Sequence, residues 1–254
     1  MPRFRANPNF DLTPDQQAAE WERMRREPRP LERPLVVLAG YHSPLVTSRL
    51  VAQNLCTLTS GVPSSVHAIA YPFAINIASA AARMMSEIQQ RFPSSDPEQT
   101  RELDVVGISM GGLVARYAAA ARVKDGRTSP RLNIRRLFTI ATPHRGAKIA
   151  RVVAVDRAAH EMVQGSSFLF QLDQDFAQRS YELVCYAQLR DWWVGATNAA
   201  PPGLTPYWTD TRGLLAFTLS HFAVNSNRAL LLDLARRLRG ESPIARDGAG
   251  PPTD

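Results

Sequence analysis

The residue of this chain that is best placed to do chemistry is a serine between two glycines. A mostly apolar run at residues 103–108 leads into Gly-Ile-Ser-Met-Gly with Ser109 at its centre, and an Ala-rich helical pattern follows. A strand, a tight turn and a helix in this order form a nucleophile elbow. Gly107 and Gly111 carry no Cβ, so the strand and the helix can approach closely while Ser109 adopts a strained conformation. The pattern predicts a nucleophilic serine.

A serine hydroxyl needs a base, and the base needs a third group that fixes its tautomer. In this architecture the three groups follow the chain order serine, acid, histidine. His42 precedes the serine, and His144 leaves no room for an acid-bearing strand after Ser109. His67 falls at the start of a strand pattern and is expected to be a packing or surface residue. His221 follows the last expected strand, and we predict that it is the base.

Two carboxylates compete for the role of the acid. Asp191 ends the fifth strand pattern and is the preferred candidate. Asp210 is the alternative, although it lies within an irregular segment rather than at a strand end. The sequence leaves the choice between them open.

The elements that must position these residues alternate between strands and helices. The expected strands are near-continuous apolar runs, as is typical of strands buried on both faces: Leu35–Ala39, Val66–Ala70, Leu103–Ile108, Ile134–Ile140, Tyr181–Gln188 and Leu214–Leu219. Helical patterns cover about 45–59, 76–91, 111–123, 145–164 and 223–239. The alternation predicts an α/β fold with three layers and a mostly parallel sheet of about six strands.

The chain divides into three parts. Residues 1–34 are expected to form a helix and a Pro-rich linker, with Thr13 as N-cap, Pro14 at the first helical position and Gln16 completing a capping box. Residues 35–240 form the main domain, and residues 241–254 are expected to be a disordered tail. Gly165–Arg179 and Trp192–Gly213 do not fit the alternation, and each is either a surface loop or a small cap over the serine.

Composition and charge point to no special partner. The formal net charge of +7 comes almost entirely from arginines spread along the chain, with 44% apolar and 21% charged residues. No pattern indicates binding to nucleic acid or a stable protein partner. We interpret the arginines first as a compositional bias, and the alternative is a transient contact with an anionic membrane surface. The two cysteines lack the spacing of metal ligands, and we expect both to be buried thiols. No signal peptide or membrane-spanning stretch is evident, so we expect a cytoplasmic protein.

Two segments resemble α/β-hydrolases of the lipase/esterase type, the group that contains triacylglycerol lipases and GPI-inositol-deacylase-like proteins. Ile108–Tyr117 resembles their elbow and the helix after it, and Thr139–Gly146 resembles their Thr-Pro-His-x-Gly turn. The resemblance implies that His144 is structural and that the backbone N–H groups of Tyr41 and Met110 form the oxyanion hole. The chain departs from the family in having Ala-Gly at residues 39–40, where members usually have His-Gly.

The resemblance implies hydrolysis of carboxylic esters through an acyl-enzyme, with no metal or organic cofactor. Aromatic residues in the two irregular segments are expected to form an apolar acyl-binding wall, which favours a lipid-like ester; these are Phe168, Phe170, Trp192 and Trp193. A thioesterase or an acyltransferase of the same fold is one alternative. A non-catalytic binding protein with a hydrolase fold is the other.

Overall fold

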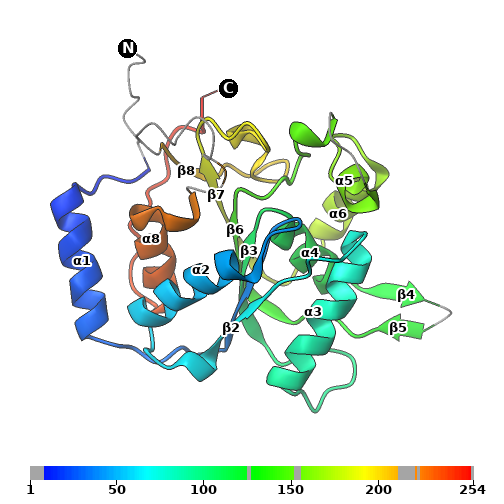
Figure 1. Cartoon of the computed structure of the whole chain (residues 1–254), viewed down its shortest axis with the longest axis horizontal. Coiled ribbons are helices and arrows are strands. Elements are labelled where there is room, and N and C mark those ends of the chain that lie inside the picture. Colours follow the sequence, from blue (N-terminus) through cyan, green and yellow to red (C-terminus); the bar gives the residue numbers. More distant parts are fainter. Residues whose placement is uncertain (1–8, 125–126, 152–155, 211–220, 222–223, 253–254) are drawn as a thin grey trace.

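A parallel six-stranded sheet forms the centre of the molecule (Figure 1). The computed structural model describes residues 9–124, 127–151, 156–210, 221 and 224–252. The strands run in the order β2-β1-β3-β6-β7-β8, and each is parallel to its neighbours. Their bounds are β1 Leu35–Leu38, β2 Val66–Ile69, β3 Leu103–Ile108, β6 Ile134–Ile140, β7 Glu182–Gln188 and β8 Tyr207–Thr209.

Five of the six expected strands are confirmed, and β3 and β6 have the predicted bounds. The strand predicted at residues 214–219 lies outside the described residues. The sixth strand of the sheet is instead β8, which pairs with β7 through Tyr186 and Tyr207. Residues 192–213, expected to be a surface loop or a small cap outside the alternation, therefore contribute a strand to the sheet. This strand is three residues long and follows Pro206, so its apolar signal is too short to stand out.

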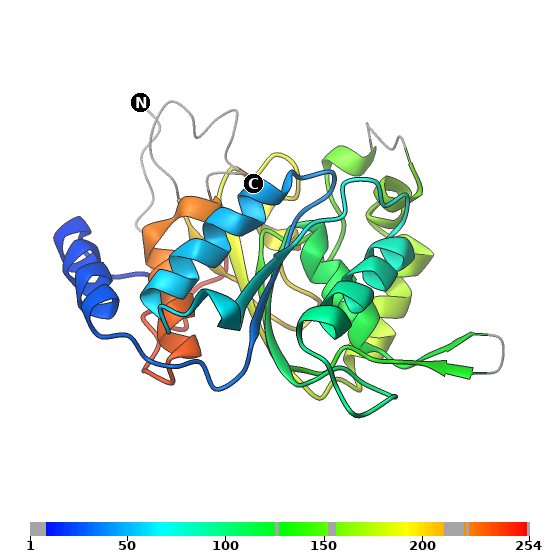
Figure 2. The same cartoon turned by 60° about the horizontal axis from the view of Figure 1, so that its bottom comes forward.

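Helices cover both faces of the sheet (Figures 1 and 2). One face carries α2 Leu45–Leu58 and α8 Arg228–Leu238, with α1 Pro14–Arg26 packed against both. The other face carries α3 Ile77–Arg91, α4 Met110–Ala119 and α6 Ser167–Phe176, with the short α5 Arg157–Glu161 beside α6. The buried apolar side chains accordingly form two large clusters, one on each face. The predicted three-layer α/β fold is confirmed.

The region between β6 and α6 differs most from the prediction. The helix expected over residues 145–164 is wrong, because the described part of this segment holds only the short helices η2 Ile149–Arg151 and α5. Gly146 has φ 104°, and a Cβ there would lie 2.5 Å from the Cα of Gln164. This close backbone approach folds the segment back on itself and prevents a continuous helix.

Two further elements were not expected from the sequence. Helix α6 lies inside the segment expected to be irregular, because Ser166 caps its N-terminus and Leu169 and Leu172 bury its apolar side. Helix α4 ends at Ala119 rather than residue 123, and the antiparallel hairpin of β4 Arg122–Lys124 and β5 Arg127–Ser129 follows it.

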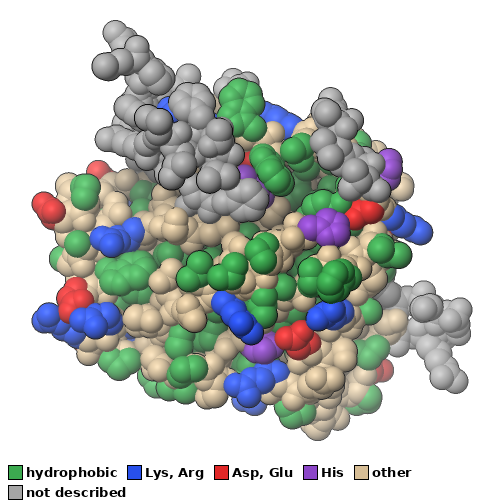
Figure 3. Space-filling view, in the orientation of Figure 1, with side chains coloured by type: hydrophobic (Ala, Val, Ile, Leu, Met, Phe, Trp, Pro, Cys, Tyr) green, Lys and Arg blue, Asp and Glu red, His purple; other side chains and the backbone are tan. Residues whose placement is uncertain are grey.

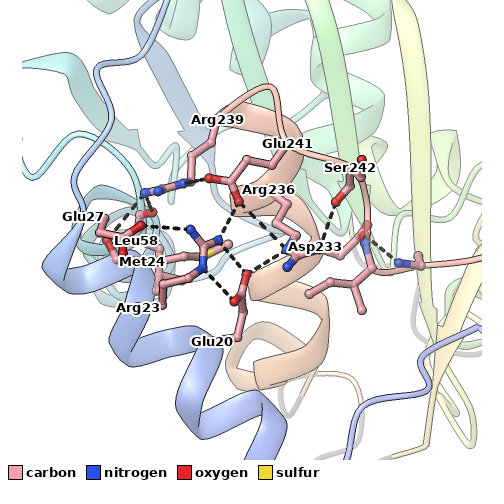
Figure 4. A network of polar contacts seen from close by, with 12 residues as sticks. Glu20, Arg23, Met24, Glu27, Leu58, Asp233, Arg236, Arg239, Glu241 and Ser242 are labelled. Atoms are coloured by element: carbon pink, nitrogen blue, oxygen red, sulfur yellow. Dashed lines mark hydrogen bonds and ion pairs between the residues drawn. The ribbon is translucent and has the colours of Figure 1, made fainter.

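Helix α1 and residues 244–245 contact the domain. The predicted capping box of α1 is present, since the Thr13 hydroxyl accepts from the N–H of Gln16 and the Gln16 side chain accepts from the N–H of Thr13. Ion pairs join α1 to α8 and to Glu241 (Figure 4). Within the segment expected to be a disordered tail, the N–H groups of Ile244 and Ala245 donate to the buried carboxylate of Asp233.

Candidate active site

Ser109 lies on a strained turn between β3 and α4. Its φ of 51° and ψ of −123° are outside the regions that residues with a Cβ prefer. Neighbouring groups hold the strain in place. The Ser109 N–H donates to the carbonyl of Ile140 at 2.8 Å, and its own carbonyl accepts from the Thr142 hydroxyl at 2.8 Å and the Gly112 N–H at 3.1 Å. The turn at Thr142 therefore fixes the position of the serine.

Glycines at this turn allow the backbone segments to meet. A Cβ on Gly107 would lie 2.5 Å from the Cα of Gly112, and one on Gly111 would lie 2.7 Å from the carbonyl oxygen of Leu38. These are distances that no side chain tolerates without a shift of backbone. The close strand–helix approach expected from the sequence is present.

His221 links the serine to a carboxylate. Its Nε2 lies 3.1 Å from the Oγ of Ser109, and its Nδ1 lies 2.8 Å from the Oδ2 of Asp191. Because an ionised carboxylate can only accept, Nδ1 carries the proton of the neutral ring, and Nε2 accepts from the serine hydroxyl. All three residues are at least 90% buried. The arrangement can take a proton from Ser109 and keep the resulting imidazolium charge beside a carboxylate.

Asp191 is held in place by the backbone that follows it. Its Oδ1 accepts from the N–H groups of Trp193 at 3.0 Å and Val194 at 3.1 Å. The indole of Trp193 stacks on the His221 ring, with the planes 4° apart and the centroids at 5.5 Å. Asp210, the alternative acid, forms an ion pair with Arg190 at 3.3 Å.

His144 is buried in a separate polar cluster. Arg116 donates to its Nδ1 at 3.0 Å, and its Nε2 lies 3.1 Å from the hydroxyl oxygen of Thr139. Burial and the charge of Arg116 lower the pKa of His144 well below its usual value. The ring is therefore neutral and donates to Thr139, which is a structural arrangement.

The loop after β1 approaches the serine from the other side. A Cβ on Gly40 would lie only 3.2 Å from the Cβ of Ser109. Because residue 40 is a glycine, the loop can approach Ser109 closely, and this approach does not depend on the side chain of residue 39. Neither the N–H of Tyr41 nor that of Met110 donates to a protein acceptor in the described part of the chain. Both groups are available to a bound oxyanion.

A pocket of about 220 Å³ opens at Ser109 and His221. It lies at the carboxyl ends of the strands, where open α/β sheets bind ligands. Apart from a few polar groups, its lining is apolar: Gly40, Tyr41, Ile108, Pro143, Ala147, Ile149, Ala150, Ala159, Met162, Trp193 and Val194. Ser43, Thr47 and Asn225 are the other polar lining residues.

The four aromatic residues expected to line the site have different positions. Trp193 lines the pocket, and Trp192 beside it is 65% exposed. Phe168 stacks on Tyr117 in α4, and Phe170 is 66% exposed on α6; neither is among the lining residues. The apolar lining from residues 147–162 was missed in the sequence, although its place directly after the Thr-Pro-His-x-Gly turn is a usable signal. Asn225 was also missed, because a lone asparagine matches no motif.

Comparison with solved structures identifies the fold. Phospholipase PlaB from Legionella pneumophila is similar with a TM-score of 0.59 at 10% identity, over 83% of this chain and 60% of that one. Lipase BlEst2 from Bacillus licheniformis, in its mature form, is similar with a TM-score of 0.50 at 15% identity, over 84% and 94% of the two chains. This chain therefore has the α/β-hydrolase fold. It spans less than two thirds of the length of the phospholipase.

A family model also matches the centre of the chain. Residues 74–173, which include the elbow, match the family DUF676, described as "Putative serine esterase". A search of curated proteins gives no match. Among the described residues, no helix is both long enough and apolar enough to cross a membrane.

Proposed function

We propose that this chain is a serine hydrolase that cleaves carboxylic esters with an apolar acyl group. The observation that carries the proposal is the continuous contact from Ser109 through His221 to Asp191, at 3.1 and 2.8 Å, at the base of a mostly apolar pocket. The match of the central segment to a serine esterase family supports the same chemistry.

Acylation of the serine is the first half of the proposed reaction. The Oγ of Ser109 bonds to the ester carbonyl carbon as its proton passes to Nε2 of His221, and Asp191 stabilises the imidazolium. The carbonyl oxygen becomes an oxyanion, which the N–H groups of Tyr41 and Met110 stabilise by about 3 kcal/mol each. The carbon–oxygen bond to the alcohol then breaks, and His221 gives its proton to the leaving alcohol.

Release of the acid is the second half. Water enters in place of the alcohol, loses a proton to His221 and attacks the acyl carbon. The bond to the Oγ of Ser109 breaks, and His221 returns its proton to the serine. The products are a carboxylic acid and an alcohol.

The surface around the pocket favours an apolar substrate. Most of the large exposed hydrophobic side chains of the described residues lie on segments that follow β1, β2 and β7, at the same end of the sheet as the pocket: Val46, Leu50, Phe73, Ile75, Trp192 and Trp193. Figure 3 shows that hydrophobic side chains are spread over the face in view, between charged ones. Such a rim suits the chain of a lipid-like ester, and a transient contact with a membrane surface is part of the proposal.

Labelling with a fluorophosphonate tests the chemistry, since only an activated serine reacts. We expect the wild-type protein to be labelled at Ser109 and to hydrolyse p-nitrophenyl esters, and Ser109→Ala to lose both properties, with turnover reduced by three orders of magnitude or more. Ser167→Ala, which changes an exposed serine at the start of α6, is the matched control and should keep full activity. Turnover that persists in Ser109→Ala would refute the proposal. A series of acyl chains from two to sixteen carbons then measures the preferred length.

A further inference from the structure

The indole of Trp193 covers one face of the proposed base. It stacks on the His221 ring with the planes 4° apart and the centroids at 5.5 Å, while Asp191 and Ser109 contact the two nitrogens at the edge of that ring. Hydrogen bonds at the edge hold the two nitrogens but restrain the tilt of the ring less. An offset parallel stack restrains the tilt, because it is a preferred arrangement of two aromatic rings. Among the described residues, Asp191 and Ser109 thus hold the edge of the base and Trp193 its face.

The backbone of Trp193 is itself held by two segments of the chain. Its N–H donates to Oδ1 of Asp191 at 3.0 Å, and its carbonyl accepts from the N–H of Ile149 at 3.1 Å. Ile149 belongs to the apolar lining of the pocket. Because both contacts are made by the main chain of Trp193, a substitution of its side chain leaves them in place. The ring at position 193 can therefore be changed without removing the hydrogen bonds that orient Asp191.

The stack gains strength when His221 takes a proton. In each half of the proposed reaction the neutral ring becomes an imidazolium. A cation within about 6 Å of the centroid of an indole is attracted to the negative face of that ring, and the attraction is stronger where water is excluded. His221 is only 6% exposed. An interaction that is stronger in the charged transition state than in the neutral ground state raises the rate of the chemical step.

We infer that the indole of Trp193 stabilises the imidazolium form of His221 and is a positioning residue for the reaction. The inference rests on the proposed function. No bond to Trp193 forms or breaks, since the proton passes from the Oγ of Ser109 to Nε2 of His221 and from there to the leaving alcohol. The expected contribution to kcat is about 3- to 10-fold, as for a cation over an indole. It should be the same for short and long acyl chains, because the charge on His221 does not depend on them.

Graded fluorination of the indole tests whether its negative face is responsible. Tryptophan with one, two or three fluorine atoms, placed at position 193 by suppression of an amber codon, stays close to the size of tryptophan and attracts a cation less with each fluorine. We expect kcat for p-nitrophenyl acetate to fall stepwise, by about 3- to 10-fold over the series, while KM changes less than about 2-fold. The same series at Trp21 is the matched control. That ring faces the guanidinium of Arg228 at 5.5 Å and does not line the pocket, so kcat should stay unchanged.

Two substitutions separate stabilisation of the imidazolium from contact with the substrate. Trp193→Leu removes the aromatic face and should lower kcat by about 3- to 10-fold, whereas Trp193→Phe keeps a smaller face and should lower it less. Because Trp193 also lines the pocket, each variant is measured with p-nitrophenyl acetate and with p-nitrophenyl octanoate. We expect the same loss of kcat for both esters. Trp21→Leu makes the same chemical change on α1 and should keep the full kcat.

Failure of this inference can be told apart from failure of the proposed function. If the wild-type protein is labelled at Ser109 and hydrolyses the acetate ester, a kcat that is independent of the number of fluorine atoms overturns the inference alone. A loss of kcat in Trp193→Leu that appears only with the octanoate ester does the same, since it makes Trp193 a contact for the acyl chain. Wild-type protein that hydrolyses neither ester and is not labelled at Ser109 would overturn both proposals.

Discussion

At the scale of the residue, Asp191 does more than balance one charge, because its own orientation is fixed by hydrogen bonds. It accepts from His221 with one oxygen and from two backbone N–H groups with the other, so its orientation is fixed before any substrate arrives. Under the proposed function this orientation holds the His221 ring in the tautomer that can accept from Ser109. A neutral amide in its place would favour the other tautomer.

We therefore expect Asp191→Asn to lower kcat by about 10³- to 10⁴-fold with little change in fold. The steady-state rate on a p-nitrophenyl ester, together with the circular dichroism spectrum, provides the measurement. Asp210→Asn is the matched control, because Asp210 is paired with Arg190 rather than with His221. A larger loss in Asp210→Asn than in Asp191→Asn would make Asp210 the acid.

Chain order favoured His221 as the partner of Ser109, and the position at a strand end favoured Asp191 over Asp210; the fold brings these three residues together. Ser109 follows β3 directly and Asp191 lies shortly after β7, and the carboxyl ends of parallel strands meet at one edge of a sheet. The pocket lining was harder to predict. Asn225 and the alanines after Gly146 line the pocket only because tertiary packing brings them there.

At the scale of the element, an ion pair ties the loop after β1 to the start of α5. The Nε2 of His42 lies 3.0 Å from the carboxylate of Asp156, and its Nδ1 lies 2.8 Å from the carbonyl of Pro72. Asp156 also caps α5 by accepting from the N–H of Ala159. Because Tyr41 precedes His42, the pair connects two segments that line the pocket.

The hydrogen bond to Asp156 raises the pKa of His42 above 6.5. A raised pKa in the folded state means that the pair stabilises the protein fully below pH 6.5, and that this contribution is lost as the pH rises through the raised value. We expect a proton NMR titration to give a raised pKa for His42 in the wild type and a lower pKa in Asp156→Asn. The melting temperatures of His42→Gln and the wild type should differ at pH 6 and converge at high pH. An unchanged pKa in Asp156→Asn would show that the pair does not form.

Elements with a run of apolar residues or a clear helix cap could be predicted from the sequence. Elements whose course depends on a contact between two backbone segments could not. β3, β6 and α1 carry their own signals in β-branched runs or a capping box. The fold of residues 145–164 depends on the contact between Gly146 and Gln164, which leaves no periodic trace in the sequence. β8 is too short for its pattern to be distinguished from a loop.

At the scale of the whole molecule, a network of charges attaches α1 to the domain (Figure 4). Glu20 pairs with Arg23 of its own helix and with Arg236 of α8, at 2.8 and 2.7 Å. Arg23 in turn contacts Glu241 at 2.6 Å. The hydrogen bond from Arg23, helped by Arg236, lowers the pKa of Glu20 to about 2.

A lowered pKa in the folded state means that this network stabilises the protein above pH 4.5 and that the contribution is lost as the pH falls toward 2. We expect Glu20→Gln to reduce the free energy of unfolding by about 1 kcal/mol at pH 7, and by steadily less below pH 4.5. Urea unfolding at a series of pH values measures both effects. Glu27→Gln is the control, because Glu27 is 60% exposed and makes one contact of 3.3 Å with Arg23. If Glu20→Gln and Glu27→Gln reduced the free energy of unfolding equally, the network would stabilise the protein no more than the exposed pair of Glu27 and Arg23 does.

The outer edge of the sheet at β8 is covered by residues from far apart in the chain. Asn9 accepts from the N–H of Trp208 with its side chain and donates to the carbonyl of Arg246, while the indole N–H of Trp208 donates to the carbonyl of Ala249. Asn9 and Arg246 are separated by 237 positions. At the usual rate of protein synthesis, roughly 5–20 residues per second, about 10 to 50 seconds pass between the synthesis of Asn9 and that of Arg246. The edge strand can therefore receive its full cover only after residues 246–249 have been translated.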